Sequence, residues 1–513
     1  MKYYPKNYLH FDKPISFDTV EKYVKDPSKI AKHSFLPLIQ FIDSFERYES
    51  KNAPNSRPVK IKNRTIMYSG HLDSYIYRYY ADYLNTNYYN HVCKKLFIDQ
   101  CVIAYRNNKQ GKSNIDFAAE VINQIVLYDQ AYIYVGDFTN YFDKINHSLL
   151  KENIKRVLNV NMLTNDWFNI YKSITKFGYY EKNFLEKNID SEKNLRSQNK
   201  RSYFNNLKEF RTFQKNNKTK FNKNDFGIPQ GTAISAVFAN IYALNFDLQM
   251  NQLAFSHSGM YRRYSDDFIL IIPISSNINN YTEIEVIIKN IAEECKINIK
   301  DEKTNTFLYS QHNLINLNNK SKQNMDYLGF NFDGKNVKMR NKSIYRFYRN
   351  AKKLINYANF KKNNNQLEKL PYRKRIYRLY TDLGESRSGR NSFIDYAKKA
   401  QTKFDYYSPH TNNMMMQQIK NRKRKLKNYQ VYNFTQKHSI QAGTYLLFVT
   451  SLTKQCLSKL LSLMIRFVYP AHGREAELDA EAQVKFSNEK DSTSREITPE
   501  TGQDLFDFDD KNK

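Results

Sequence analysis

The chain has 513 residues, a formal net charge of +30 and a pI near 9.6. This length allows two or three domains, and the basic excess is typical of proteins that bind nucleic acid. The four cysteines are dispersed without zinc-ligand spacing, and no uninterrupted apolar span reaches the ~20 residues of a membrane helix. The composition therefore disfavours disulfide-stapled, zinc-finger and membrane-spanning classes, and we expect a cytoplasmic protein with no membrane partner.

The N-terminal 55 residues combine helical and irregular patterns. Residues 57–68 (RPVKIKNRTIMY) then alternate basic and apolar side chains, which predicts a hairpin strand with one charged face. Lys62 and Arg64 are the best placed to contact phosphate oxygens, with Arg57 and Lys60 as competitors. A simply solvated basic face is the alternative.

Residues 104–118 (AYRNNKQGKSNIDFA) contain a GKS triplet. A phosphate-binding loop of the G-x-x-x-x-G-K-[ST] type needs a glycine where this chain has Arg106. The sequence therefore excludes that loop.

A short apolar run, Ala131–Val135, predicts a buried strand. It ends in Gly136-Asp137, and Phe138, Tyr141-Phe142 and Asp143 follow. An acid at a strand end is often only a cap, so Asp137 gains weight only from an acidic partner elsewhere in the chain.

Two segments separate this strand from the next acidic element. Residues 176–224 are rich in Lys and Asn and are expected to be a mobile or nucleic-acid-facing insertion, or a plain solvated loop. Residues 227–247 (GIPQGTAISAVFANIYALNFD) form a turn-rich loop followed by a helix from Ser235 to Asp247. A packed connection is the alternative for this second segment.

Asp266 and Asp267 lie in YRRYSDDFILII (residues 261–272), at the tip of an expected tight hairpin. Adjacent acids repel each other, and hard divalent cations with oxygen ligands are the usual compensation. A solvated turn is the alternative. With Asp137 as a third carboxylate, the set predicts two magnesium ions (manganese is the substitute) that serve phosphoryl or nucleotidyl transfer.

These blocks resemble motifs A, B and C of reverse transcriptases. The matching positions are Asp137, Tyr141, Phe142 and Asp143 for motif A; Gly227, Pro229, Gln230, Gly231, Ser235, Ala239 and Asn240 for motif B; and Tyr264, Ser265, Asp266 and Asp267 for motif C. Asp301–Thr304 resembles the lysine-bearing motif D, and Tyr327–Phe330 resembles the primer-grip motif E. Ala236 departs from the proline that many relatives have in motif B. The resemblance covers roughly residues 50–335.

The resemblance implies a role for each matching residue. Asp137, Asp266 and Asp267 would be the catalytic carboxylates and metal ligands, together with the backbone of Phe138. Phe142 would exclude a ribose 2′-hydroxyl, and Lys303 would assist the departing pyrophosphate. The other nucleotide-binding positions would be Lys62, Arg64, Gln230, Gly231 and Tyr264. The primer grip would be Tyr327, Leu328 and Gly329.

The implied fold is α+β: fingers and palm with an antiparallel palm sheet, followed by an α-helical C-terminal domain, with HEAT-like repeats as one form of it. We expect an N-terminal segment and fingers at 1–135, the palm at 136–335, the helical domain at 340–470 and an acidic disordered tail at 471–513.

The AYR…GKS stretch resembles a subgroup, the prokaryotic defence-associated or abortive-infection reverse transcriptases of the "unknown group". That resemblance implies antiphage defence, a homo-oligomer and, in some members, priming from a tyrosine of the chain itself. Candidate tyrosines are Tyr406, Tyr407, Tyr429, Tyr432 and Tyr445, and the sequence does not choose among them. Implied partners are deoxynucleoside triphosphates and RNA or single-stranded DNA, including a noncoding RNA. The alternatives are a templated reverse transcriptase of retron or group II intron type, and an inactive nucleic-acid-binding scaffold.

Overall fold

The computed structural model describes residues 3–48, 59–274, 281–380, 392–407, 411 and 413–420. The chain divides into two compact units. The first contains residues 1–110, 120–327 and 332–335, and the second contains residues 111–119, 328–331 and 336–513. Helices accompany antiparallel sheets in the first unit and dominate the second, which confirms the predicted α+β class with a helical C-terminal region.

A six-stranded antiparallel sheet forms the centre of the first unit. Its strand order is β10-β9-β8-β3-β7-β6. The predicted strand is present as β3, and the predicted hairpin is the pair β6–β7. The strands are β3 (Gln130–Asp137), β6 (Met260–Tyr264), β7 (Asp267–Pro273), β8 (Asn305–Ser310), β9 (Asn313–Asn316) and β10 (Ser321–Lys322).

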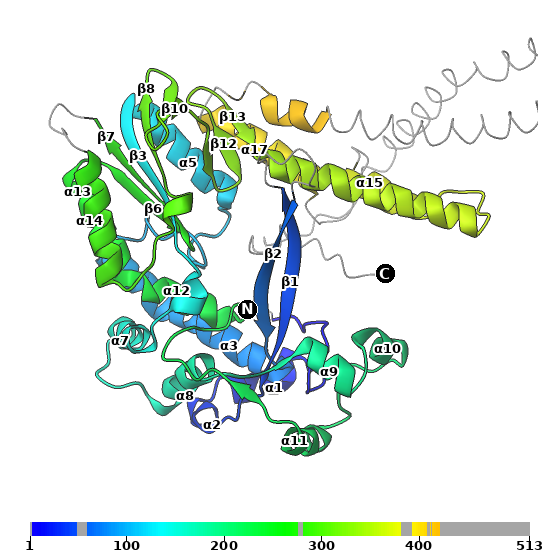
Figure 1. Cartoon of the computed structure of the whole chain (residues 1–513). Helices are drawn as coiled ribbons and strands as arrows, with labels where there is room; N and C mark the ends of the chain where they lie inside the picture. The colour runs from blue at the N-terminus through cyan, green and yellow to red at the C-terminus, as the bar shows by residue number, and fades with distance from the viewer. Residues whose placement is uncertain are drawn as a thin grey trace, which may run out of the picture. The chain divides into compact units, whose positions relative to one another are not determined.

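Both faces of this sheet are covered. Helices α13 (Leu244–Ser256) and α14 (Tyr281–Glu294) lie over one face (Figure 1), where Tyr132 stacks on Tyr281 with ring centroids 4.7 Å apart. On the other face, Arg262 of β6 forms an ion pair of 2.6 Å with Glu120 of α5 (Asn114–Leu127). Successive side chains of a strand point to opposite faces of the sheet. Because both faces are covered here, β3 and β7 consist mainly of continuous apolar runs.

A second sheet has the order β2-β1-β4-β5. Its strands are β1 (Leu38–Tyr48), β2 (Val59–Tyr68), β4 (Gly178–Glu181) and β5 (Lys220–Phe221). β1 and β2 pair antiparallel and form a long ribbon (Figure 1), as expected of residues 57–68. The expectation of helix or irregular chain for all of residues 1–55 is wrong at β1. The LIQFIDSFERY segment mixes acids with apolar residues, and pairing with β2 decides its conformation.

Residues 176–224 form an ordered module, so the expectation of a mobile or solvated loop is wrong. β4 pairs in parallel with β1, and three short helices follow: α9 (Lys182–Asn188), α10 (Glu192–Ser197) and α11 (Leu207–Asn216). Phe210 of α11 stacks on Phe11 with centroids 4.3 Å apart, inside a small core that includes Tyr180 and Leu195. Because Lys and Asn are so abundant in this segment, its composition alone does not reveal the few apolar residues that anchor it.

Several of the remaining elements of the first unit pack around motif B. Helix α12 packs against both α3 and α7. The helix expected over Ser235–Asp247 is present but breaks at Ala243, where α12 ends and α13 begins. The elements are α1 (Phe17–Val24), α2 (Pro27–Ala31), α3 (His71–Leu84), η1 (Asn85–Tyr89), α4 (Asn90–Lys95), α6 (Tyr141–Lys144), α7 (His147–Leu158), α8 (Asn165–Thr175), α12 (Ala233–Tyr242), η2 (Asp301–Lys303) and β11 (Met325–Tyr327).

The C-terminal part of the chain is helical where it is described. The short strands β12 (Phe330–Phe332) and β13 (Val337–Met339) are followed by α15 (Asn341–Asn364), α16 (Arg373–Tyr380) and α17 (Phe393–Tyr407). In α15, Ile344, Phe347 and Ile355 are buried, whereas Arg346 and Lys352 are exposed, as the predicted basic face requires. The acidic tail, 471–513, lies outside the described residues. No described helix is both long and apolar enough to cross a membrane.

Candidate active site

The three aspartates lie at neighbouring strand ends. Asp137 is the last residue of β3 and pairs in register with Asp267, the first residue of β7. The backbone N–H of Phe138 donates to the carbonyl of Asp266 at 3.0 Å, so the chain after β3 is bound to the hairpin tip. Asp137 and Asp266 are half-buried and Asp267 is exposed. Main-chain pairing therefore brings together the backbones of acids that are far apart in the sequence.

Gly136 makes this approach possible. It pairs with Phe268, and a Cβ atom on Gly136 would lie 2.3 Å from the Phe268 ring. The missing side chain lets the ring cover the strand directly beside Asp137. Any larger residue would force the Phe268 ring or the strands to shift beside Asp137.

The hairpin tip is a two-residue turn. Tyr264 and Asp267 are its closing pair, and Ser265 has φ = 60°. A positive φ at the first turn position is the geometry of type II′ turns, which usually place glycine there. Here a serine adopts it, so surrounding contacts must hold the turn.

Arg263 supplies the main contact, which the motif comparison alone does not reveal. Its side chain is fully buried, and Nη1 donates to the carbonyl of Ser265 at 2.8 Å and to Asn240 Oδ1 at 3.2 Å. The other side of the guanidinium donates twice to Asp247, at 2.7 Å each. Tyr261 donates its hydroxyl to the same carboxylate at 2.8 Å. One arginine thus joins the motif C turn to the motif B helix.

The motif B loop is bound to motif A by backbone hydrogen bonds. Ile228 N donates to the Phe142 carbonyl at 2.9 Å, and Gly227 N donates to the Ile145 carbonyl at 2.8 Å. Gly227 has φ = 87°. Tyr141 also donates its buried hydroxyl to the carbonyl of Ala239, at 2.6 Å. The position of the half-buried Phe142 is therefore fixed by its own backbone.

The same loop meets the β1–β2 ribbon. Met67 N donates to the Gln230 carbonyl at 2.8 Å. Gly231 has φ = 126°, and a Cβ there would lie 2.4 Å from the Met67 carbonyl oxygen and 3.2 Å from Ile66 Cγ2. Ile66, Arg64 and Lys62 share one strand face because side chains alternate. Both cations therefore extend from the strand face that reaches the motif B loop.

Lys62 and Arg64 differ in exposure. Lys62 is half-buried, whereas Arg64 is exposed and its guanidinium lies 5.4 Å from the centroid of the Phe45 ring. Arg57 and the side chain of Lys60, the two competitors, lie outside the described part of the chain.

Tyr105 is a further residue at the site that motif matching missed. Ser265 Oγ donates to its hydroxyl at 3.3 Å. Burial raises the pKa of the Tyr105 hydroxyl, the Ser265 hydrogen bond lowers it, and the charges of Asp266 and Arg64 act on it in opposite directions. Tyr105 therefore lies within electrostatic range of both the hairpin tip and β2. Its AYR position was singled out in the sequence only as a subgroup signature.

The structure describes the positions of motif D and motif E only in part. Lys303 ends η2, and its side chain is outside the described atoms. Tyr327 ends β11 with a buried hydroxyl, and burial raises its pKa. In the second unit, Leu328 and Gly329 have φ values of 44° and 95°, which define a tight turn.

The GKS triplet has a local structural role. Ser113 donates through its backbone N–H and its hydroxyl to Asp116 Oδ2, at 2.8 and 3.0 Å, at the start of α5. Arg106, at the position where a phosphate-binding loop needs glycine, is buried and bonded to Asp99 at 2.6 Å. Both contacts agree with the exclusion of that loop.

The donor chemistry of the three aspartates fits hard divalent cations, which prefer carboxylate oxygens. Within the described residues, no three His, Cys, Asp or Glu side chains already converge as a metal site. The strand pairing brings the aspartate backbones together, and side-chain rotation would have to complete the ligand set.

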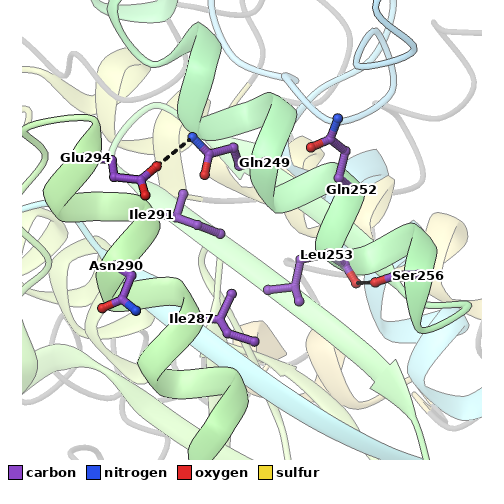
Figure 2. A pocket seen from close by; sticks show the side chains of 8 residues that line it. All are labelled: Gln249, Gln252, Leu253, Ser256, Ile287, Asn290, Ile291 and Glu294. Atoms are coloured by element: carbon purple, nitrogen blue, oxygen red, sulfur yellow. Dashed lines mark hydrogen bonds between the residues drawn. The ribbon is translucent and has the colours of Figure 1, made fainter.

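A groove of about 460 Å³ lies elsewhere, between α13 and α14 (Figure 2). None of its lining residues belongs to the three motifs, so it is separate from the candidate active site. They are Gln249, Gln252, Leu253, Ser256, Ile287, Asn290, Ile291 and Glu294.

Part of the chain matches a known protein family. Residues 107–332 match the family "Reverse transcriptase (RNA-dependent DNA polymerase)". No curated protein matches the sequence significantly.

Solved structures that resemble the chain include two fungal telomerases and one viral polymerase. Apo telomerase from Candida tropicalis, truncated of its C-terminal domain, is 14% identical with a TM-score of 0.37 over 66% of this chain and 64% of its own length. The chain thus spans a little less than two thirds of that telomerase.

Telomerase from Candida albicans, in complex with a fragment of telomeric RNA, gives 13% identity and a TM-score of 0.34 over 83% of this chain and 67% of its own. The RNA-dependent RNA polymerase of a human picobirnavirus gives 9% identity and a TM-score of 0.31, over 57% of this chain and 44% of its own. These likenesses are too distant to transfer residue roles. Residues 107–332 are therefore similar to the reverse transcriptase family over less than half of the chain.

Proposed function

We propose that the chain is a DNA polymerase that joins deoxynucleotides to a primer end, with Asp137, Asp266 and Asp267 as its catalytic carboxylates. The observation that carries the proposal is the in-register pair Asp137–Asp267, together with the backbone bond from Phe138 to Asp266. Nucleotidyl transfer requires clustered oxygen ligands at one point, and these contacts bring the backbones of the three acids together from two separate segments.

The carboxylates would hold two divalent cations, magnesium or manganese, with the Phe138 carbonyl as an additional ligand. When bound, such cations activate the attacking hydroxyl and offset charge on the leaving pyrophosphate. Arg263 keeps the Asp266 turn in place, and Gly136 keeps the two strand ends close. The chain's own contribution is therefore to position its acids before any substrate arrives.

The incoming triphosphate would lie between β2 and the motif B loop. Lys62 and Arg64 extend from the strand face that meets Gly231, and cationic side chains suit phosphate oxygens. Gln230 and Gly231 would line the nucleotide. Phe142, whose carbonyl accepts from Ile228, would place its ring against the sugar and exclude a 2′-hydroxyl. Lys303 would act near the pyrophosphate.

A primer-extension assay tests the proposal. The full chain would be incubated with magnesium, a primed RNA or DNA template and labelled deoxynucleotides or ribonucleotides. Extension with deoxynucleotides is the expected result. Nucleic-acid binding without any incorporation, under templated and untemplated conditions alike, would favour an inactive scaffold.

A finer proposal is that the enzyme belongs to the defence-associated subgroup and primes synthesis from its own tyrosine. The resemblance of residues 104–118 supports the subgroup, and Tyr406 on α17 is 80% exposed. The side chain of Tyr407 and all of Tyr429, Tyr432 and Tyr445 lie outside the described part.

Incubation without primer or template tests this finer proposal. Label that migrates with the protein and is released by protease is the expected result, and Tyr406→Phe would remove it if Tyr406 is the primer. Tyr345→Phe, at another exposed tyrosine, is the matched control. Synthesis only on an added primed template would favour a retron-like or intron-like enzyme. Loss of phage resistance in cells that carry Asp266→Asn would test the defence role.

A further inference from the structure

The module inserted between motifs A and B carries a strongly basic outer surface. Residues 176–224 contain 13 Lys and Arg against five Asp and Glu. Within 205–224 the imbalance reaches six basic residues against the single acid Glu209. Solvated basic faces are common, so the arrangement of these side chains, rather than their number, has to carry the argument.

Helix α11 sorts its side chains by face. Phe210 is buried and Phe213 and Gln214 are half-buried, whereas Lys208, Arg211 and Lys215 are exposed. These three positions recur at i, i+3 and i+7, so they form one stripe along the helix. The helix cannot rotate freely, because the stacking of Phe210 on Phe11 fixes which face is outermost.

Further exposed side chains follow α11 along the chain. Lys218 and Lys223 flank β5 and are exposed, and Phe221 within β5 is 58% exposed. The Phe221 ring lies over Gly178 of β4, where a Cβ would be 2.9 Å from it. We call Lys208, Arg211, Lys215, Lys218 and Lys223, together with Phe221, the α11 strip.

The cations of the α11 strip are uncompensated. Across the described ranges, none of these five side chains forms an ion pair, although Lys182, Arg196 and Lys220 of the same module each pair with a glutamate. The single acid of α11, Glu209, is instead hydrogen-bonded by Asn205 and Asn206. Within the described residues, these five exposed cations therefore have no acidic partner that explains them.

We infer that the α11 strip binds a single strand of nucleic acid outside the catalytic cleft. Phosphates of such a strand would contact the lysines and the arginine, and a base would stack on Phe221, the combination that single-strand binders use. β5 is the edge of its sheet opposite β2, so this surface is separate from the strand that carries Lys62 and Arg64. A duplex hides its base faces and would gain nothing from Phe221.

Fluorescence anisotropy with the full chain, without nucleotide or magnesium, tests the inference. The probes are labelled single-stranded RNA, single-stranded DNA of the same sequence, and the DNA duplex. Lys208→Glu/Arg211→Glu/Lys215→Glu should weaken single-strand binding about tenfold or more and reduce the salt slope by about 2. The matched control reverses three exposed lysines elsewhere: Lys22 of α1, Lys32 just after α2, and Lys172 of α8.

Phe221→Ala should weaken single-strand binding about tenfold and leave duplex binding unchanged. If the charge-reversal variant of α11 fails to fold, Lys208→Gln/Arg211→Gln/Lys215→Gln replaces it, because glutamine has a helix propensity close to that of lysine and arginine. Equal losses from the α11 and control reversals, or equal losses on duplex and single strand from Phe221→Ala, would overturn the inference. Polymerisation does not enter this measurement, so its outcome is independent of the proposed function.

Discussion

Arg263 and Asp247 form a two-point ion pair in which neither side chain is exposed, with both N–O distances at 2.7 Å. The pair lies directly beneath the turn that carries Asp266, and Arg263 also donates to the Ser265 carbonyl at 2.8 Å. The placement of Asp266, which we propose as a catalytic carboxylate, therefore depends on a buried ion pair.

Removing the arginine should strongly destabilise the fold. Arg263→Met leaves Asp247 buried without its counter-ion, which typically costs about 3–5 kcal/mol of unfolding free energy. Arg262→Met is the matched control, because the Arg262–Glu120 pair is partly exposed and should contribute only about 1 kcal/mol. Urea unfolding would measure both. Equal losses in the two variants would contradict the role given to the buried pair.

Keeping the charge while changing its shape should affect catalysis more than stability. Arg263→Lys can still pair with Asp247 but cannot also reach the Ser265 carbonyl, because an ammonium lacks the fork of the guanidinium. A shifted Asp266 turn should lower kcat by roughly 10- to 100-fold, with little change in KM. Steady-state incorporation kinetics on protein that melts cooperatively would measure this. An unchanged kcat would show that the turn holds itself.

The contact between Gly136 and the Phe268 ring can be tested with a destabilising substitution and a second substitution that compensates for it. Gly136→Ala places a methyl group against the Phe268 ring and should cost about 1–3 kcal/mol and most of the activity. Phe268→Leu in the same chain removes the ring and should restore part of both. Thermal melting and incorporation assays would follow the pair. If the double variant were no better than Gly136→Ala alone, the ring contact would not be the reason for glycine.

Phe142 should control sugar selectivity. Phe142→Ala would open space beside the sugar, and the preference for deoxynucleotides should fall by about 10- to 200-fold. The competition between matched deoxynucleotide and ribonucleotide triphosphates measures it. Phe168→Ala, at an exposed ring on α8, should leave the preference unchanged. Unaltered selectivity in Phe142→Ala would rule out the gate.

Asp99 should contribute to the decrease of the unfolding free energy at acid pH. Burial alone would raise the pKa of its carboxyl, but Lys109, Asn108 and Arg106 outweigh burial and lower it to about 2. Because the pKa of Asp99 in the folded protein lies below the ordinary value of 3.8, its contribution to stability is complete above about pH 4. It is lost as the pH falls toward 2.

Asp99→Asn should therefore cost about 1–2 kcal/mol at pH 5.5 and nearly nothing at pH 2. Urea unfolding at a series of pH values is the measurement, with the exposed Asp18→Asn as control. A penalty that did not depend on pH would show that Asp99 contributes through its shape alone.

Local patterns explain what the sequence could predict. The strand ending in Asp137 and the hairpin carrying Asp266 are encoded by runs of neighbouring apolar residues, and both are present as β3 and β6–β7. The family motifs add the order of these elements along the chain. Their exact juxtaposition, down to the pairing of Asp137 with Asp267, needs the register of the sheet.

Long-range strand pairing and ion pairing account for the features that the sequence could not predict. β1 gains its conformation from β2 on one side and from β4, more than 130 residues later, on the other. One feature of the sequence indicates the Arg263–Asp247 pair. In the alternating pattern of β6, Tyr261 and Arg263 both occupy inward positions. A charged residue at an inward position demands a buried partner, but the sequence does not name it.

The most direct test of the account is nucleotide incorporation by Asp266→Asn. Asparagine keeps the size and the turn contacts but removes the charge that a divalent cation requires. The account predicts loss of deoxynucleotide incorporation to background at any magnesium concentration, with cooperative melting and nucleic-acid binding unchanged, while Asp18→Asn retains full activity. Substantial incorporation by Asp266→Asn would contradict the assignment of this carboxylate cluster as the catalytic centre.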